Sequence, residues 1–587
     1  MRVRTISIFL VMVALITGMV GCIPGPVQYD LTISVTEGGE VVTPSEATSS
    51  YNEGTVVPIV AFPHTGYHFD NWTGEVDTVA DVHAASTTVT MNGSYEITAN
   101  FEETPVDRPL VTFAVAGPMT EVQGKHQWWG AELARDEINA GPGINVGGVY
   151  HQVELVQVDT EETPGIPDEG VAALQAVIDD VDFVLGSFRA ECVVGYREVA
   201  MEAQKIFMNC GSAAGFLQFS VVTNYDKYKY WFKATPYNEV FLVSSLCKMT
   251  TAIGRVLRAT LEEYGDDVSP DYRVGEDGKL RVAILMEDAL WCQGMVTAAQ
   301  YLLPLLGYTV AGTTLVSPTA ADITADLNAL KALNPHVIFT AFSDSVGDVY
   351  SVQKADLRIP AMTIGVNVVG QLTGHWSNTE GKCNGEIVLD DWAEGLQYTA
   401  KTTAFFDAFM AKTGEYPLYT AGTYDAIYSL KEAIEAVSAT HGWNNITDVI
   451  DPDNIDAIIQ YLEASSYTGG APTTAYYPMP AIELGGGVYA LSKEQVRALY
   501  PDLATYNQTN WLCTASGGPH IAHDIVYGPG HATGIGSQWQ DGHKVGVWPM
   551  DLGDEYDAAL TDQYGCWNFE YPGTVDVMIP IEGFLSS

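Results

Sequence analysis

Four side chains near the C-terminal end of the sequence are of types that bind zinc: His520, His523, Asp524 and His531. Imidazole nitrogens and carboxylate oxygens are common zinc ligands, so these residues raise the question of a metal site. The chain contains no HExxH sequence, no GxSxG elbow and no Walker loop. Those motifs would support metal-dependent hydrolysis, acyl transfer or nucleotide hydrolysis. We therefore expect no metal, no cofactor and no catalytic residue.

Cysteine is the other reactive residue type. The chain has Cys22, Cys192, Cys210, Cys247, Cys292, Cys383, Cys513 and Cys566. No two of them have CxxC spacing, so neither a zinc ribbon nor a thioredoxin-type site is supported. If Cys22 carries a lipid, seven cysteines remain, which is an odd number. At least one thiol is then free or paired between chains, and some disulfides are plausible outside the cytoplasm.

The composition excludes several classes of protein. The 587 residues carry a formal charge of −46, and such a surface repels the phosphates of nucleic acids and anionic lipids. Hydrophobic residues make up 47% of the chain and charged residues 17%, which is not the composition of a disordered acidic protein. Beyond the first 20 residues no apolar run is long enough for a polytopic membrane protein.

The N-terminus has the pattern of a targeting segment. Arg2 and Arg4 precede an apolar stretch at 6–16, and the sequence GMVGC ends at Cys22. This pattern resembles a bacterial lipobox, which implies a lipoprotein signal peptide at 1–21, lipidation of Cys22 and a lipid-anchored linker at 22–28. The alternatives are an ordinary secretory signal and a retained membrane helix. We expect an extracytoplasmic protein held at the membrane, at the cell surface or in the periplasm.

Residues 29–103 alternate apolar and polar residues with a period of two, and Gly and Asn-Gly stand between the runs. This pattern predicts a small β-rich module with strands at 31–35, 55–60, 87–91 and 95–101. The strings GYHFDNWTGEV and TTVTMNGSYEITANFEE resemble the InlB-type B-repeat, which implies a β-grasp-like spacer of surface proteins. A stalk is favoured over an adhesive module, because a single copy offers little avidity. Residues 104–108 form a short linker.

Short apolar runs alternate with helical periodicity in the rest of the chain. The predicted strands are 110–116, 153–158, 183–186, 206–208, 280–286, 309–315, 337–342 and 361–365, and the predicted helices are 128–139, 170–179, 193–203, 295–305 and 321–333. This order predicts an α/β fold with two doubly wound parallel-sheet lobes and a hinged cleft between them. Ligands bind such sheets where strands end, near helix N-termini.

The motifs that carry a family resemblance occur in a fixed order. They are GPMTEVQGKHQWWGAELARDEIN, FVLGSFRAECV, KIFMNCGSAA, RVAILMEDALWCQG, NPHVIFTAF, IPAMTIGVN and HDIVYGPGHATGIGSQWQDGHKVGVWP. Together they resemble the type I periplasmic binding proteins, in particular the branched-chain amino-acid and amide-binding proteins of ABC transporters. The last motif reads like that family's closing hairpin, which accounts for its His-Asp pair without a metal.

The resemblance covers about 108–440 and 520–550 of a binding domain at 108–587. It implies a first lobe at about 108–236 and 395–485 and a second lobe at about 237–394 and 520–587. Residues 260–279 and 450–519 look like insertions, and 551–587 form an unusual tail.

The resemblance also implies where a ligand would be held in lobe one. Arg189 follows the strand at 183–186, and Ala190 stands where the family often has a serine. Arg189 could therefore clamp a ligand carboxylate with two parallel hydrogen bonds, or it could point to solvent or pair with Glu191. Gln123 stands where an aromatic residue is common in the family.

The loop after the strand at 206–208 fits the family's backbone cradle. Gly211 permits a close approach of the backbone, Ser212 offers a hydroxyl group, and Ala213 completes the loop. The alternative is a plain turn without a binding role.

In lobe two, Trp291 stands where the family places an aromatic lid, although a core tryptophan is an equal alternative. Phe342 and Ser343 end a strand that faces the cleft in relatives. Asn367 replaces the acid that usually binds the ligand ammonium group, which weakens the case for a simple zwitterionic amino acid. Asp344 or Glu287 could compensate for that loss.

These observations lead to one main functional hypothesis. The chain would be a lipid-anchored solute-binding protein of an ABC importer, which closes its lobes on a small polar ligand such as an amino acid or an amide. Its partners would be the permease subunits, the solute and the membrane, with no nucleic acid. The alternatives are a sensory or adhesive lipoprotein with the same fold and, more weakly, a hydrolase within the insertions.

Overall fold

The computed structural model describes residues 27–44, 48–64, 67–103, 108–162, 168–235, 239–397, 399–464, 466–468, 474–475, 535–550 and 574–586. The proposed signal peptide and Cys22, and the zinc candidates His520, His523, Asp524 and His531, lie outside these residues. The chain divides into two compact units, Met1–Thr104 and Pro105–Ser587. In the described parts of the chain, no helix is both long and apolar enough to cross a membrane.

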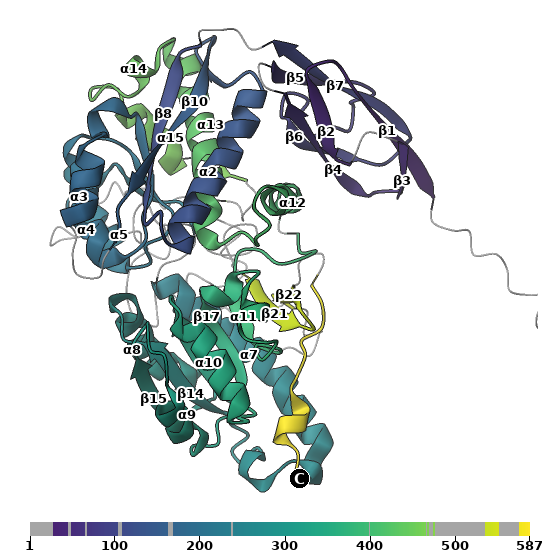
Figure 1. Ribbon diagram of the computed structural model, residues 1–587, viewed down its shortest axis with the longest axis vertical. Coiled ribbons are helices and arrows are strands. Elements are labelled where there is room, and N and C mark those ends of the chain that lie inside the picture. Colours follow the sequence, from purple (N-terminus) through teal and green to yellow (C-terminus); the bar gives the residue numbers. More distant parts are fainter. Residues whose placement is uncertain are drawn as a thin grey trace, which may run out of the picture. The chain divides into compact units, whose positions relative to one another are not determined.

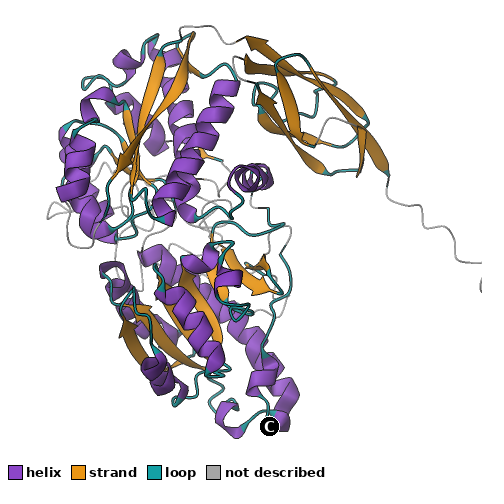
Figure 2. Ribbon diagram, viewed as in Figure 1, coloured by secondary structure: helices purple, strands orange, loops and turns teal. Residues whose placement is uncertain are grey.

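The first unit is built from two small sheets (Figures 1 and 2). Its strands are β1 (Gln28–Val35), β2 (Gly39–Thr43), β3 (Thr48–Asn52), β4 (Val56–Pro63), β5 (Tyr67–Gly74), β6 (Ser86–Thr90) and β7 (Tyr95–Glu103). One sheet has the order β3-β1-β7-β5, with β1 parallel to β7, and the other has the order β2-β4-β6. Trp72 and Phe69 pack together in the core, and the Trp72 indole donates a 2.9 Å hydrogen bond to the Ala84 carbonyl. The predicted β-rich module is confirmed.

The second unit begins with a six-stranded sheet, which we call lobe one together with its helices. Its strands are β8 (Leu110–Gly117), β9 (Ile144–Val146), β10 (Val149–Asp159), β11 (Phe183–Gly186), β12 (Phe207–Asn209) and β13 (Trp231–Lys233). The order is β13-β12-β11-β8-β10-β9, and all pairs except β9–β10 are parallel. The central strands are buried on both faces, as parallel sheets covered by helices require.

Helices cover both faces of the lobe-one sheet (Figure 1). They are α2 (Val122–Ala140), α3 (Asp168–Gln175), α4 (Ala190–Glu202), α5 (Gly215–Thr223), α6 (Tyr225–Tyr228), α12 (Thr402–Thr413), α13 (Thr423–His441), α14 (Ile446–Val449) and α15 (Asp456–Ala464). The last four come from residues 402–464, which lie between two stretches of the chain that belong to lobe two, and α13 packs along α2. Lobe one is therefore assembled from two separate stretches of sequence.

Lobe two contains a seven-stranded sheet. Its strands are β14 (Arg281–Glu287), β15 (Thr309–Val316), β16 (Val337–Phe342), β17 (Met362–Asn367), β18 (Ile387–Asp390), β21 (Ile535–Gln540) and β22 (His543–Trp548). The order is β15-β14-β16-β17-β18-β21-β22. The first five strands are parallel, and β21 and β22 form the predicted closing hairpin, antiparallel to β18. The predicted doubly wound lobes are confirmed.

Alternate side chains of β14 show how lobe two is wound. Val282, Ile284 and Met286 belong to the core cluster shared with α7 (Glu239–Tyr264) and α8 (Leu290–Leu305). Ala283 and Leu285 point to the other face, in the cluster with α9 (Thr324–Lys331) and α10 (Val346–Asp356). A strand exposes successive residues to opposite faces, so an uninterrupted apolar strand needs helices on both.

The segments described as an insertion and a tail pack against each other in lobe two. Helix α7 continues to Tyr264, and Val268 forms a bridge with Leu585. The ring of Phe584 is fully buried, with its centroid 5.4 Å from that of Tyr272 and 6.4 Å from that of His336. The described part of the tail is thus a component of the lobe-two core.

Gly186 ends β11 immediately before the predicted binding loop. Its φ is +111°, and a Cβ atom there would lie 2.2 Å from the Ala116 carbonyl oxygen. Because both the backbone angle and the space exclude a side chain, we expect Gly186→Ala to cost about 1–3 kcal/mol of unfolding free energy. Thermal unfolding would measure it, with Gly414→Ala, a positive-φ glycine with open space around it, as the control for backbone strain alone. Equal losses in the two variants would contradict the role of the Ala116 contact.

Candidate functional site

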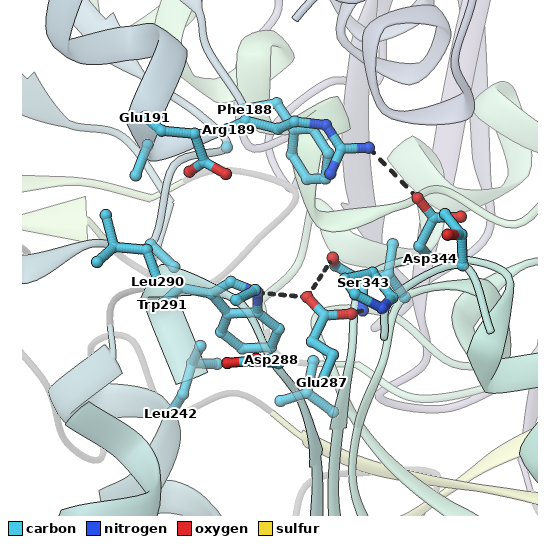
Figure 3. Close-up of a pocket in the computed structure, with 18 of the residues that line it drawn as sticks. Phe188, Arg189, Glu191, Leu242, Glu287, Asp288, Leu290, Trp291, Ser343 and Asp344 are labelled. Atoms are coloured by element: carbon cyan, nitrogen blue, oxygen red, sulfur yellow. Dashed lines mark hydrogen bonds and ion pairs between the residues drawn. The ribbon is translucent and has the colours of Figure 1, made fainter. Parts of the chain in front are cut away.

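The carboxyl ends of strands from both lobes surround one cavity of about 370 Å³. Its lining is Phe188, Arg189, Ala190, Glu191, Gly211, Ala213, Leu242, Glu287, Asp288, Ala289, Leu290, Trp291, Pro318, Thr319, Ser343, Asp344, Val366, Val368 and Tyr419. Figure 3 shows Arg189 reaching across to Asp344, with Trp291 and Glu287 on the other side of the cavity. The volume and the mixed lining are typical of a small-molecule site.

Arg189 is held by two carboxylates and one aromatic ring. Its Nη2 atom lies 3.1 Å from Oε2 of Glu121 and 3.4 Å from Oδ2 of Asp344. The guanidinium carbon lies 5.2 Å from the centroid of the Phe188 ring. Arg189 therefore neither points to solvent nor pairs with Glu191, and its ion pair with Asp344 joins the two lobes.

Glu287 is a fully buried acid at the end of β14. Its Oε1 accepts 2.6 Å hydrogen bonds from the Trp291 indole and from the Ser343 hydroxyl, and its Oε2 accepts a 2.7 Å bond from the Ser343 backbone amide. Burial raises the pKa of Glu287, although these donors work in the opposite direction. The carboxyl group fixes the orientation of Trp291 and Ser343 at the cavity wall.

The lobe-one loops are braced by hydrogen bonds beneath the cavity. Ser187 has a φ of +86°, and its hydroxyl donates a 2.6 Å bond to Oδ1 of Asn209. A Cβ atom at Gly211 would lie 1.9 Å from the Ser187 carbonyl oxygen, so only glycine allows the two loops to approach this closely. Because the two loops lie this close together, Arg189 and Ala213 both line the lobe-one side of the cavity.

Two helices begin at the cavity. Helix α4 has Arg189 as its N-cap residue and α8 has Ala289, and neither N-cap side chain caps its helix. The first backbone N–H groups of a helix have no partner within it, and they carry a partial positive charge of about half a unit. They can donate to an acceptor group of a ligand.

The structure places the ten predicted binding residues in two groups. The cavity is lined by Arg189, Ala190, Gly211, Ala213, Trp291 and Ser343. The lining does not include Gln123, Ser212, Phe342 and Asn367.

Each of the four outlying residues has a structural environment of its own. Phe342 is fully buried and packs on Tyr350, because it points to the opposite face of β16 from Ser343. Asn367 accepts a hydrogen bond from the Gly370 amide in the turn after β17. Gln123 donates to the Ser343 carbonyl oxygen at 3.3 Å and thus supports the cavity from behind. Ser212 is buried below the loop.

Sequence reasoning missed the apolar part of the lining. Leu242 comes from α7, Leu290 from the first turn of α8, and Tyr419 from the chain that returns to lobe one. No local motif distinguishes such residues from core residues. The strand-end rule alone could have indicated Val368, which follows β17.

The described residues contain no group of three or more His, Cys, Asp or Glu side chains that could hold a metal ion. Their five cysteines, Cys192, Cys210, Cys247, Cys292 and Cys383, are buried, and no disulfide joins two of them. Burial raises the pKa of the Cys210 thiol to about 12, which keeps it protonated and unreactive at neutral pH.

Two parallel-sheet lobes, a closing hairpin and a cavity lined by strand ends and helix starts define a two-lobed small-molecule binding protein. The family model of periplasmic binding proteins matches residues 111–478, which is more than half of the chain. The chain therefore belongs to the periplasmic binding protein family. That family consists of solute-binding proteins rather than enzymes and acts outside the cytoplasm. The model of the divergent InlB B-repeat domain matches residues 29–105.

Solved structures show the same fold. A putative branched-chain amino acid ABC transporter protein from Silicibacter pomeroyi is 19% identical with a TM-score of 0.53, over 78% of this chain and 99% of its own. A leucine-binding protein from Thermotoga maritima is 15% identical with a TM-score of 0.50, over 74% of this chain and 97% of its own. A solute-binding protein from R. palustris in complex with benzoate is 12% identical with a TM-score of 0.50, over 75% and 95%. No curated protein matches the sequence.

Proposed function

We propose that the protein is the lipid-anchored solute-binding component of an ABC importer. It would capture a small polar ligand by closing its two lobes, and deliver it to membrane permease subunits. The observation that carries this proposal is the cavity itself, since polar groups from lobe one (Arg189) and lobe two (Ser343, Asp344) line the same space in a chain of this family. Two structural relatives support the importer assignment: the T. maritima protein is named a leucine-binding protein, and the S. pomeroyi protein a putative branched-chain amino acid ABC transporter.

The residues proposed to contact the ligand are those that both the sequence and the cavity indicate. They are Arg189, Ala190, Gly211, Ala213, Trp291 and Ser343. Gln123 and Ser212 would position this lining, and Asn367 and Phe342 would hold the ends of β17 and β16.

The attachment to the membrane is part of the same proposal. Residues 1–21 would be removed, Cys22 would carry the lipid, and the B-repeat module would act as a stalk that holds the binding domain away from the membrane. Treatment with a labelled fatty acid tests this: label should enter the wild-type chain and not the Cys22→Ser variant. Equal labelling of the two chains would contradict lipidation at Cys22.

Ligand binding is tested by thermal unfolding of residues 22–587 with Cys22→Ser, against a panel of amino acids, amides, amines and short carboxylates. A ligand at about 100 times its Kd should add about 2.7 kcal/mol to the stability of the binding domain. Trp291→Ala should remove that gain, because it deletes a wall of the cavity and a donor to Glu287.

The control variant is Trp443→Ala, since Trp443 is also partly buried but stacks on His441 in lobe one and does not line the cavity. It should keep the full ligand response. If every compound leaves the unfolding temperature unchanged, the transport proposal fails. The B-repeat module then favours the alternative of a sensory or adhesive surface lipoprotein.

A further inference from the structure

Among the described residues, the charged side chains that line the cavity are mostly acidic. Four of them are carboxyl groups, from Glu191, Glu287, Asp288 and Asp344, and one is the guanidinium of Arg189. Burial raises the pKa of Glu287, yet even with Glu287 protonated the carboxylates outnumber the guanidinium three to one. The cavity therefore has a negative field that attracts a positively charged ligand.

Arg189 is the single cation among the described residues of the lining, and two acids already neutralise its charge. Both ion pairs of Arg189 use Nη2, with Glu121 at 3.1 Å and Asp344 at 3.4 Å, and only 13% of the side chain is exposed. A ligand carboxylate that bound the guanidinium of Arg189 would lie beside both of these acids. Like charges at such distances in a partly buried site are strongly unfavourable.

The helix starts at the cavity do not reverse this balance. The N-termini of α4 and α8 together contribute about one positive charge, which leaves an excess of negative charge in either protonation state of Glu287. Their N–H groups suit an uncharged acceptor, such as a carbonyl or hydroxyl oxygen of a ligand. The negative charge of the cavity and the N–H groups at the two helix starts therefore favour the same ligand: a cation that also carries an uncharged acceptor group.

The other lining residues indicate that the uncharged part of the ligand is apolar. Leu242, Leu290, Val366 and Val368 present alkyl groups, and Trp291 presents an indole ring held by Glu287. An aromatic face next to carboxylates is favourable for an ammonium or guanidinium group with alkyl substituents. An apolar body then gains free energy from burial against the four alkyl side chains.

We infer that the ligand of this cavity is an organic cation without a carboxylate: a protonated amine, a guanidine or a quaternary ammonium compound on a largely apolar body. The inference rests on the proposed solute-binding function and narrows its ligand class. It sets this chain apart from a binding site for zwitterionic amino acids or for aromatic acids.

The test uses sets of compounds that share a carbon skeleton and differ in charge. One set is 3-methylbutylamine, L-leucine and 4-methylpentanoate, and the other is 2-phenylethylamine, L-phenylalanine and 3-phenylpropanoate. Choline and agmatine extend the cationic class. Each is titrated into residues 22–587 carrying Cys22→Ser, and binding is followed by thermal unfolding and calorimetry. We expect at least one cation to bind, and to bind more tightly than the zwitterion and the anion of its set.

A charge variant then locates the effect in the cavity. Asp288 lines the cavity and is exposed, so Asp288→Asn should leave the fold intact and weaken binding of the cation by about two- to fivefold, with a smaller loss at high salt. The matched control is Glu380→Gln, which removes an exposed acid of lobe two that lies outside the cavity. It should change the affinity by less than Asp288→Asn does.

The remaining outcomes would contradict either the cation inference or the solute-binding function. If leucine, phenylalanine or either carboxylate binds more tightly than its amine, the cation inference is wrong while the solute-binding function stands. If amines bind equally well to the Asp288→Asn and wild-type proteins at low salt, the acidic lining does not select the ligand. If no compound of any charge binds, the solute-binding proposal itself fails.

Discussion

Replacing Lys544 by methionine is expected to lower the unfolding free energy of the two-lobed domain by about 3–5 kcal/mol. Lys544 lies on β22 and is fully buried, and its Nζ donates at 2.5 Å to Oδ2 of Asp390 and at 2.7 Å to the Gln371 carbonyl oxygen. Asp390 is equally buried, at the end of β18. The substitution keeps the volume of the side chain but leaves the Asp390 carboxylate without its counter-charge.

A second substitution distinguishes the energetic effect of the Lys544–Asp390 ion pair from that of the surrounding packing. Asp390→Asn in the Lys544→Met background removes the uncompensated charge, and it should recover a large part of the loss because desolvating two charges offsets most of their attraction. Calorimetric unfolding of the full chain measures both variants, with the B-repeat module as an internal reference. Two outcomes would count against the buried pair: a loss below about 1 kcal/mol in the single variant, or no recovery in the double variant.

The second large effect concerns pH. Glu137 on α2 and Glu162 after β10 are buried, and desolvation raises the pKa of each to about 7. An acid whose pKa is raised by folding is protonated more readily in the folded state. Its contribution is therefore most favourable at acidic pH and is lost as pH rises from about 4.5 to 7. Each group should lower the stability of the binding domain by roughly 3 kcal/mol over that range.

Glu137→Gln tests this effect. Oε2 of Glu137 accepts both of its hydrogen bonds, from the Tyr424 hydroxyl at 2.6 Å and from the Tyr428 hydroxyl at 2.9 Å. One amide oxygen can accept both, so glutamine keeps the contacts and removes the ionisation. We expect the variant to gain up to roughly 3 kcal/mol at a pH well above 7 and nothing below about 4.5. A gain that is the same at both pH values would mean that packing, and not ionisation, accounts for it.

Several secondary-structure elements could be predicted from local sequence alone. The strands predicted at 183–186 and 337–342 coincide with β11 (Phe183–Gly186) and β16 (Val337–Phe342), and helix α8 begins only five residues before its predicted start. These elements depend on runs of apolar, β-branched residues and on their period, which are properties of neighbouring residues. The lobe boundaries and the closing hairpin were instead implied by the family resemblance, through the order of its motifs. The family resemblance indicated Arg189, Gly211 and Trp291, and the cavity brings them together because the carboxyl ends of parallel strands converge on one edge of a sheet.

The partners of those residues could not be chosen in this way. Arg189 pairs with Glu121 and Asp344, which are 68 and 155 residues away, and Glu287 binds Ser343, which is 56 residues away. Which loops meet depends on the order of strands across two sheets, and no local pattern encodes that order. Sequence reasoning therefore treated Arg189 as a clamp for a ligand carboxylate, whereas the structure shows it held by two acids.

The sequence by itself determined the B-repeat module, the two α/β lobes and the strand ends at which a ligand would be held. Only the tertiary structure decided the sign of the cavity's charge and which of two adjacent residues faces it. Phe342 and Ser343 are neighbours, yet Phe342 is in the core against Tyr350 and Ser343 lines the cavity. Side chains alternate between the faces of a strand, so a shift of one residue exchanges core and cavity, and only packing against both helix layers fixes that register.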